Sequence, residues 1–380
     1  MKKIKENYPL MIRPYKESKV WGIDGIGEYW YGKAEGEQSS VLNADNLSVK
    51  ACDFINENAN EILGNDVVNK YGRFLPLIKI LTPKGRLSVQ FHDQKNELWI
   101  ITGIDKKIAG NNPKLIIGFS PAMIDVHGKG ILEKYKKALC DFGLKLNLLM
   151  DVMIQKGYKK ILDEEKDIIN AAYKVNEDEK IKKALNDLID KKKYLDTFYN
   201  YLEVKIGDVV PVPQGTLHAL GPGIEIVEPQ IAGPTQSTED GATYPIRYYF
   251  PDFPVSGANK KLDIDRVNEI LPEKWKSEPP RKILQKNGVK IERLPGGFEN
   301  KGMAVDRIIL SGGSQLSVET KSYHMLTSVK GEPSIKIGKK IFKIPAASKN
   351  GDMMLIPALV GKYVILCAAD TEIIDTYTPV

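Results

Sequence analysis

The chain has 380 residues, of which 42% are hydrophobic and 27% charged, and its formal net charge is +6. This length suits two or three domains with sizeable cores, and no segment combines clustered Arg and Lys with aromatic residues, so we expect no nucleic-acid partner. No stretch approaches the ~18 apolar residues of a membrane span, and no apolar core follows the basic N-terminus as in a signal peptide. Cys52, Cys140 and Cys367 have neither disulfide-framework nor thiolate-metal spacing. We therefore expect a cytoplasmic protein without a membrane partner.

The first part of the chain has the pattern of antiparallel β-structure. Residues 7 to about 118 are short apolar runs interrupted by Gly, Pro and Asn, as is typical of strands joined by turns. Residues 43–71 are the exception and predict helix. From 120 to about 201 apolar residues recur at intervals of three and four, for example in 131–139 and 180–189, which predicts amphipathic helices. We interpret this stretch as a helical insertion.

Strand patterns resume at residue 203 and continue to about 250. The stretch 272–280 is rich in Pro and charge and predicts a linker, and alternating apolar residues predict a further β domain from 281 to 380. His324 in that domain has no companion at ligand spacing, so we interpret it as structural. We interpret His127, in a loop before a helix, as a surface residue.

Four residues that can bind a metal stand in the two β segments. Gln90 and His92 are two apart in an extended run, so their side chains are predicted to point to one face of a strand. Glu97 follows after four polar residues and opens an apolar run, which predicts a hairpin that returns Glu97 to the side of His92. His218 comes much later, in a run punctuated by Gly and Pro. Only a closed β fold would gather all four.

The spacing of these residues resembles the two motifs of the cupin superfamily, with Gln in place of the first His of the first motif. Pro222 stands where the second motif usually ends in Asn. The two matched patterns are Gly85-x4-Gln90-x-His92-x4-Glu97-x5-Gly103 and Gly207-x5-Pro213-x-Gly215-x2-His218.

Further segments, scattered from about residue 8 to residue 250, resemble the type I phosphomannose isomerases, zinc-dependent cupins that interconvert mannose 6-phosphate and fructose 6-phosphate. These segments include Ile12-Arg-Pro-Tyr-Lys16, Gly27-Glu-x-Trp30, Lys95-x-Glu97-x-Trp99, Val212-Pro-x-Gly-Thr-x-His218, Ile226-Val-Glu-Pro-Gln230 and Thr243-Tyr-Pro-Ile-Arg247. The resemblance implies a mainly β fold with a helical insertion, in which a cupin jelly-roll barrel that carries the metal is followed by a second cupin-like β domain. The implied domains are the catalytic barrel (1–118 with 203–260), the helical insertion (119–202), a linker (261–280) and the C-terminal β domain (281–380).

The resemblance also implies a metal-dependent aldose–ketose isomerase that acts on a small sugar phosphate through an enediol. Gln90, His92, Glu97 and His218 would bind one divalent ion. Family likeness implies Zn²⁺, and iron, manganese, nickel or cobalt also suit a mixed N/O set. Such an ion polarises the sugar oxygens as a Lewis acid. The family positions further assign proton transfer to Glu228, charge stabilisation to Arg247, and contacts with the sugar phosphate to Lys79, Ser88 and Lys95. Orienting a ligand His is the alternative role for Glu228.

One departure from the family leaves alternatives open. Only four residues separate His92 from Glu97, where the family usually has a long segment that forms part of the pocket wall. We therefore expect a more open pocket, which leaves room for a different sugar phosphate or an epimerase-like use of the same chemistry. A non-catalytic cupin that binds a sugar or its phosphate, and an oxidative iron cupin, are the alternatives from other classes.

Overall fold

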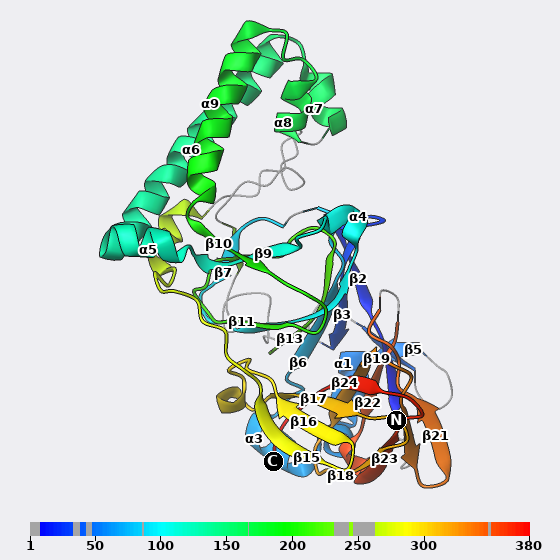
Figure 1. Ribbon diagram of the computed structural model, residues 1–380. Coiled ribbons are helices and arrows are strands. Elements are labelled where there is room, and N and C mark those ends of the chain that lie inside the picture. Colours follow the sequence, from blue (N-terminus) through cyan, green and yellow to red (C-terminus); the bar gives the residue numbers. More distant parts are fainter. Residues whose placement is uncertain are drawn as a thin grey trace.

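The computed structural model describes residues 8–32, 39–42, 48–85, 87–165, 167–231, 243–245, 263–348 and 351–380. Its four antiparallel sheets form two sandwiches, with a group of helices projecting from one end and the C-terminus toward the other (Figure 1). Mainly β architecture interrupted by helices is what the sequence predicted.

The first sandwich combines a five-stranded and a six-stranded sheet. The interior between them is filled by apolar side chains such as Trp99, Ile117 and Ile226. The five-stranded sheet has the order β10 (Tyr199–Glu203), β9 (Lys114–Phe119), β12 (His218–Ala219), β7 (Gln90–His92) and β14 (Thr243–Pro245). The six-stranded sheet has the order β11 (Val209–Val212), β8 (Glu97–Ile104), β13 (Ile224–Ile231), β6 (Pro76–Leu81), β3 (Ile26–Gly32) and β2 (Tyr15–Ile23).

The predicted hairpin between His92 and Glu97 is wrong. β7 pairs with β12 and β14, whereas β8 pairs with β11 and β13 in the other sheet. The four intervening residues therefore cross from one sheet to the other. The reason lies in β8, both of whose faces are buried. Trp99 faces the interior of the sandwich, and Leu98 faces the core on the other side of the sheet. A strand that is apolar on both faces lies inside a sheet that is covered on both sides. Glu97 consequently faces His92 across the sandwich.

The helical insertion connects the neighbouring strands β9 and β10. The apolar faces of its helices pack together and against the outer face of the five-stranded sheet, where Phe91 and Ile116 join their core. This agrees with the apolar repeat of three and four residues, which gives each helix one apolar stripe. The segment comprises α5 (Pro121–His127), the 3₁₀ turn η1 (Gly128–Gly130), α6 (Ile131–Gln155), α7 (Lys159–Glu165), α8 (Ile168–Tyr173) and α9 (Glu179–Asp196).

The C-terminal sandwich combines a nine-stranded and a four-stranded sheet, and apolar side chains such as Ile308, Leu326 and Ile365 fill its interior. The larger sheet has the order β15 (Arg281–Lys286), β16 (Val289–Arg293), β17 (Ala304–Leu310), β24 (Thr371–Tyr377), β19 (His324–Lys330), β22 (Met353–Ile356), β1 (Leu10–Arg13), β4 (Ser40–Leu42) and β5 (Ser48–Lys50). The smaller sheet has the order β18 (Gln315–Glu319), β23 (Lys362–Leu366), β20 (Ser334–Ile337) and β21 (Lys340–Lys343).

Three N-terminal strands thus belong to the C-terminal sheet, β1 pairing with β22. Between the two sandwiches lie short helices whose side chains Phe54 and Ile62 share one core with Ile78 of β6 and Met325 of β19. The domain boundaries implied by the sequence remain a prediction. The shared core packs the first predicted domain against the C-terminal one. The short helices are α1 (Ala51–Glu57), α2 (Ala59–Leu63) and α3 (Asn65–Tyr71).

The expected linker packs against the first sandwich over its described part. Val267 and Ile270 are buried in the helical core, and the Trp275 indole donates a hydrogen bond to the carbonyl of Pro211 at 3.0 Å. No helix in the described part of the chain is long and apolar enough to cross a membrane. The remaining short elements are α4 (Lys106–Ala109), η3 (Ile264–Glu269), η4 (Glu299–Lys301) and η5 (Ala358–Val360).

Candidate metal centre

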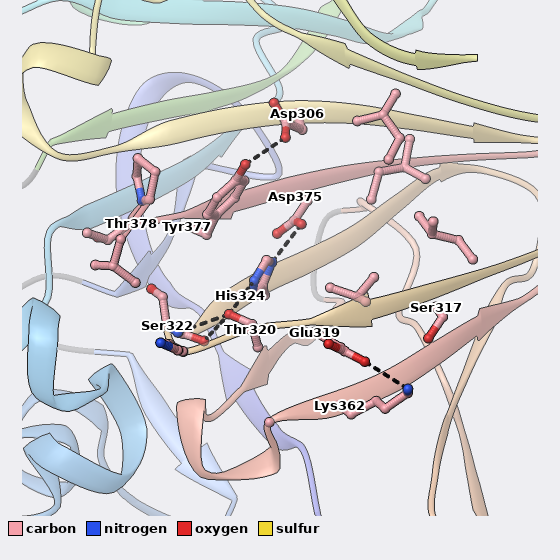
Figure 2. A pocket seen from close by; sticks show the side chains of 18 of the residues that line it. Asp306, Ser317, Glu319, Thr320, Ser322, His324, Lys362, Asp375, Tyr377 and Thr378 are labelled. Atoms are coloured by element: carbon pink, nitrogen blue, oxygen red, sulfur yellow. Dashed lines mark hydrogen bonds and ion pairs between the residues drawn. The ribbon is translucent and has the colours of Figure 1, made fainter. Parts of the chain in front are cut away.

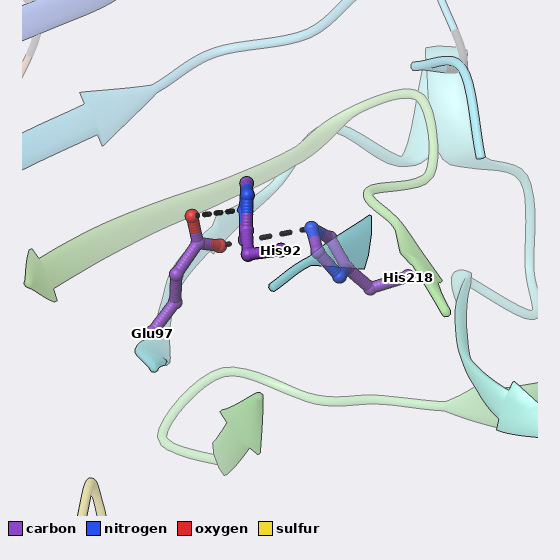
Figure 3. A group of neighbouring side chains, drawn as sticks. All are labelled: His92, Glu97 and His218. Atoms are coloured by element: carbon purple, nitrogen blue, oxygen red, sulfur yellow. Dashed lines mark ion pairs between the residues drawn. The ribbon is translucent and has the colours of Figure 1, made fainter. Parts of the chain in front are cut away.

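The two sheets of the first sandwich bring His92, Glu97 and His218 together in its interior (Figure 3). Gln90 on β7 and His218 on β12 are cross-strand partners, so their side chains share a face. His92 lies two residues from Gln90 on that face, and Glu97 points at both histidines from β8. His92 Nε2 is 2.8 Å from Glu97 Oε1, and His218 Nε2 is 3.9 Å from Glu97 Oε2. All three side chains are buried.

The hydrogen bonds of His218 decide which of its nitrogens faces the cluster. Its Nδ1 lies 2.9 Å from the carbonyl oxygen of Thr216, and because a carbonyl only accepts, Nδ1 carries the proton. In the neutral ring Nε2 therefore presents a lone pair. Gln90 Nε2 lies 3.2 Å from it, as a donor would. Coordination by the Gln90 carbonyl oxygen requires the amide to rotate by about 180°, an exchange of O and N positions that such amides allow.

Burial sets the charge state of the three groups. Burial lowers the pKa of His92 to about 3, with help from the nearby Lys95 ammonium, and burial also lowers the pKa of His218. Both imidazoles are therefore neutral. Burial alone would raise the pKa of Glu97, but Lys95, whose Nζ lies 2.7 Å from Glu97 Oε1, and His92 hold that pKa well below its usual range. Two neutral nitrogens and one carboxylate suit a divalent metal ion.

Polar side chains continue from this cluster across the inner face of the six-stranded sheet. The Trp99 indole N–H lies 3.2 Å from Glu97 Oε2 and 3.1 Å from Glu228 Oε2, so it links the two carboxylates. Glu228 on β13 is the cross-strand partner of Lys79 on β6. Lys79 Nζ is 3.7 Å from Glu228 Oε1 and 3.5 Å from Glu28 Oε2. In this polar row the Trp99 indole lies between the carboxyl groups of Glu97 and Glu228, and the Lys79 ammonium lies between those of Glu228 and Glu28.

Glu228 differs from Glu97 in its proton affinity. Burial raises the pKa of Glu228 to about 8, and the neighbouring Glu97 charge adds to the effect while Lys79 opposes it. The Gln230 amide donates a hydrogen bond to Glu228 Oε1 at 3.1 Å. A carboxyl group held in place with a pKa near neutrality can both accept and release a proton under physiological conditions.

The residues singled out in the sequence have different outcomes. The structure gathers all four candidate ligands, and Glu228, Lys79 and Lys95 lie beside them. Ser88 is buried two residues before Gln90. Arg247 lies outside the described residues.

Sequence reasoning missed two members of the polar row, Trp99 and Glu28. Trp99 stands two residues after Glu97, and the strand period of two would have placed its indole on the same face as the carboxylate. Glu28 likewise stands two residues before Trp30, whose indole donates a hydrogen bond to it at 2.8 Å, so the strand period would have placed these two side chains on one face. Its contact with Lys79 had no local signal, because the two residues are distant in sequence.

His324 and His127 lie elsewhere. His324 is buried in the C-terminal sandwich. His127 ends α5, half-buried, with its ring 6.1 Å from that of Phe198.

No family model matches the chain. Among characterised proteins, mannose-6-phosphate isomerase ManA of Bacillus subtilis is 26% identical over 182 residues, a match that spans 48% of this chain and about half (53%) of that relative. The solved mannose 6-phosphate isomerase of B. subtilis is similar with a TM-score of 0.63 and 18% identity, over 98% of this chain and 99% of that one. A zinc-bound mannose 6-phosphate isomerase has a TM-score of 0.63 at 14% identity, over 98% and 100%. The fold is thus shared, and the resemblance stated from the motifs is confirmed.

Proposed function

We propose that this relative of the type I phosphomannose isomerases is a metal-dependent aldose–ketose isomerase that interconverts mannose 6-phosphate and fructose 6-phosphate, or a close sugar phosphate. The observation that carries the proposal is the buried cluster of His92, Glu97 and His218, which stand at the ligand positions of the family motifs. The Trp99 indole links this cluster to Glu228, whose carboxyl group has a pKa of about 8.

His92, Glu97 and His218, with the carbonyl of Gln90, would hold the ion, and zinc is the metal bound by a similar solved structure. When bound, the ion supplies Lewis-acid polarisation of the sugar oxygens. The remaining requirement of an aldose–ketose isomerisation is a group that carries a proton between C1 and C2.

We assign proton transfer to Glu228. Its two oxygens are fixed by Trp99 and Gln230, and Lys79 at 3.7 Å stabilises the carboxylate once the proton has left. Arg247, which the resemblance matches to the family's arginine although two further residues, Pro245 and Ile246, stand before it here, is assigned to stabilise negative charge on the enediol oxygens.

For the phosphate we favour Lys95 and Ser88. Lys95 lies beside the cluster and forms an ion pair with Glu97, its Nζ 2.7 Å from Glu97 Oε1. Lys79 is a weaker candidate for this role, because Glu228 and Glu28 flank it on both sides and their charges outweigh the effect of burial to raise its pKa. We therefore expect Lys79 to hold Glu228 more than to bind phosphate.

The test is a panel of sugar phosphates incubated with metal-replete protein in deuterated water. Isomerisation through an enediol exchanges the proton at C2 with solvent, so mannose 6-phosphate or a close analogue should gain deuterium as product forms. The Glu97→Gln variant is the matched control and should show neither deuterium incorporation nor product formation. Tight binding of a sugar phosphate without any exchange would instead support the alternative, a non-catalytic cupin.

A further inference from the structure

The segment 93–96, which crosses between the two sheets of the first sandwich, is held by residues from the C-terminal part of the chain. Lys301 of η4 donates a hydrogen bond to the carbonyl of Gln94 at 3.0 Å. Arg266 of η3 forms an ion pair with Asp93, its Nη2 3.4 Å from Asp93 Oδ2. The two partners stand 207 and 173 residues further along the chain. A segment that carries no regular structure is thus fixed from outside its own sandwich.

Asn96, the last residue of this segment, joins three parts of the chain. Its Oδ1 accepts a hydrogen bond from the backbone N–H of Gln214 at 3.0 Å. Its Nδ2 lies 3.4 Å from the carbonyl oxygen of Gly296 and 3.4 Å from that of Gly297. A backbone N–H only donates and a carbonyl only accepts, so these neighbours determine which way the amide faces. A side chain with both a donor and an acceptor is what this position requires.

These contacts lie next to the candidate metal ligands. Asn96 directly precedes Glu97, and Gln214 belongs to the loop that leads into β12. The next residue of that loop, Gly215, donates its N–H to the carbonyl of His92 at 2.6 Å. Metal sites keep their ligand distances within about 0.2 Å. A contact that fixes this backbone therefore also affects how well the ligands meet an ion.

The turn that receives the Asn96 amide, residues 294–302, is itself firmly packed. Leu294 and Phe298 are buried in the core that the two sandwiches share. Between them Gly297 has a φ of +64°, and a Cβ atom on this residue would lie 2.7 Å from Asn96 Nδ2. Both the backbone conformation and the close approach to Asn96 therefore favour glycine.

Polar side chains inside the C-terminal sandwich are partnered differently. Tyr377 donates a hydrogen bond to Asp306 at 2.9 Å, and His324 Nδ1 lies 2.7 Å from Asp375 Oδ2 (Figure 2). All four residues belong to strands of one sheet, so their contacts hold that sheet together. Asn96 instead connects the metal-ligand loops of one sandwich to a turn that leads into the other.

We propose that Asn96 is a positioning residue that makes the metal affinity of the first sandwich depend on the packing of the turn 294–302. The turn orients the Asn96 amide, and the amide holds together the two loops that carry Glu97 and His218. This inference rests on the metal centre proposed above and adds a requirement for the C-terminal part of the chain. Because coupling between two equilibria is reciprocal, a bound ion also stabilises the packed turn.

The experiment measures the dissociation constant of Zn²⁺ for the full chain and its variants, by competition with a chromophoric chelator. Asn96→Ala removes the amide, Gly297→Ala displaces it from the side of the turn, and a double variant combines the two changes. Gly338→Ala is the control for the glycine, because Gly338 has a similar φ of +58° but nothing within 4 Å of an added Cβ. Asn58→Ala is the control for the asparagine, because it removes an amide that donates to the carbonyl of Phe54 at 2.9 Å.

Asn96→Ala and Gly297→Ala should each bind Zn²⁺ at least ~10-fold more weakly than the wild type, the lower end of the effect of groups that orient metal ligands. The double variant should be no weaker than the weaker single variant, because both changes break one contact. Gly338→Ala and Asn58→Ala should bind Zn²⁺ as the wild type does, even where their melting temperatures fall. Zn²⁺ should also slow hydrogen exchange of the backbone amides of 294–302 in the wild type and not in Asn96→Ala.

The proposal is overturned if the wild type binds no Zn²⁺, if Asn96→Ala keeps the wild-type affinity, if the control variants lose as much affinity, or if the two effects add in the double variant. Melting curves without metal establish that each variant is folded, and Gly297→Ala leaves every residue of the first sandwich unchanged. An isomerase assay separates this proposal from the proposed function. A wild type that binds Zn²⁺ and shows the coupling but isomerises no sugar phosphate would refute the function and leave the coupling intact.

Discussion

The two sandwiches of this chain both turn a row of polar side chains inward, but they use histidine in opposite ways. In the first sandwich His218 gives Nδ1 to a backbone carbonyl and directs Nε2 at Glu97. In the C-terminal sandwich His324 has Asp375 on one nitrogen and Thr320 on the other. A histidine serves as a metal ligand only where one nitrogen keeps its lone pair for the ion. The comparison teaches that hydrogen-bond partners, more than burial, distinguish a ligand from a structural residue.

The strongest test of this comparison exchanges each histidine for alanine. His218→Ala should reduce bound metal well below one equivalent, because the remaining ligands hold an ion poorly, and should lower isomerase activity at least ~10³-fold, as expected when a Lewis acid worth several kcal/mol is lost. His324→Ala should keep its metal. Elemental analysis of the purified variants, with an activity assay, decides this. Equal metal loss in both variants would show that the effect is one of folding.

The ligand set was accessible from sequence because local geometry indicated one pair of ligands and a known motif spacing indicated the other pair. Gln90 and His92 share a face by the period of a strand, and the cupin-like spacing supplied Glu97 and His218. The crossing between the sheets was not accessible, since a short polar segment between two strands has the same pattern whether it turns within one sheet or passes to another. The pairing of β1 with β22 joins residues at opposite ends of the chain, and no local pattern encodes such a contact.

The second test concerns the carboxylates. Glu228→Gln keeps the shape of the side chain but cannot accept a proton, so it should retain metal and lose at least ~10²-fold in kcat, the usual worth of a positioned general base. Deuterium incorporation into the sugar should fall in parallel. Asp306→Asn makes the same chemical change in the C-terminal sandwich and should leave kcat unaltered. If Glu228→Gln exchanges deuterium at the wild-type rate, another group is the base.

The third test removes the link between the two carboxylates. Trp99→Phe deletes the indole N–H but keeps an aromatic ring near His218, whose ring centre lies 5.5 Å away. Because groups that orient a ligand usually contribute 10–100-fold to metal affinity, the metal dissociation constant should rise by about that factor. Tyr377→Phe, which removes a hydroxyl donor to Asp306, is the control and should bind metal normally. Unchanged affinity in Trp99→Phe would mean that Glu97 is held without the indole.

The fourth test asks whether Lys95 acts on the phosphate or on the chemistry. Lys95→Ala should raise KM by about 10–100-fold, the worth of a hydrogen bond between charged groups, while kcat stays near the wild-type value, because a contact far from C1 and C2 contributes uniform binding. Lys362→Ala, which breaks the pair with Glu319 in the C-terminal sandwich, should change neither constant. A lower kcat at constant KM would indicate that Lys95 acts through its contact with Glu97.

The smallest effect expected is on stability, and it tests the proton affinity of Glu228 without any assay of activity. In metal-free protein the pKa of Glu228 is raised from 4.5 to about 8, so between these values the folded chain keeps a proton that the unfolded chain has released. Folding is therefore favoured most at low pH, and the free energy of unfolding should fall as pH rises through this window, by at most ~1.4 kcal/mol per pH unit from this group. Glu228→Gln has no such proton, so its curve should be flatter than that of the wild type. Urea denaturation of both proteins in the presence of a chelator, at several values between pH 5 and 8, measures the difference. Parallel curves would mean that Lys79 keeps Glu228 ionised throughout, and a carboxylate so stabilised would be a poor base for carrying a proton between two carbons.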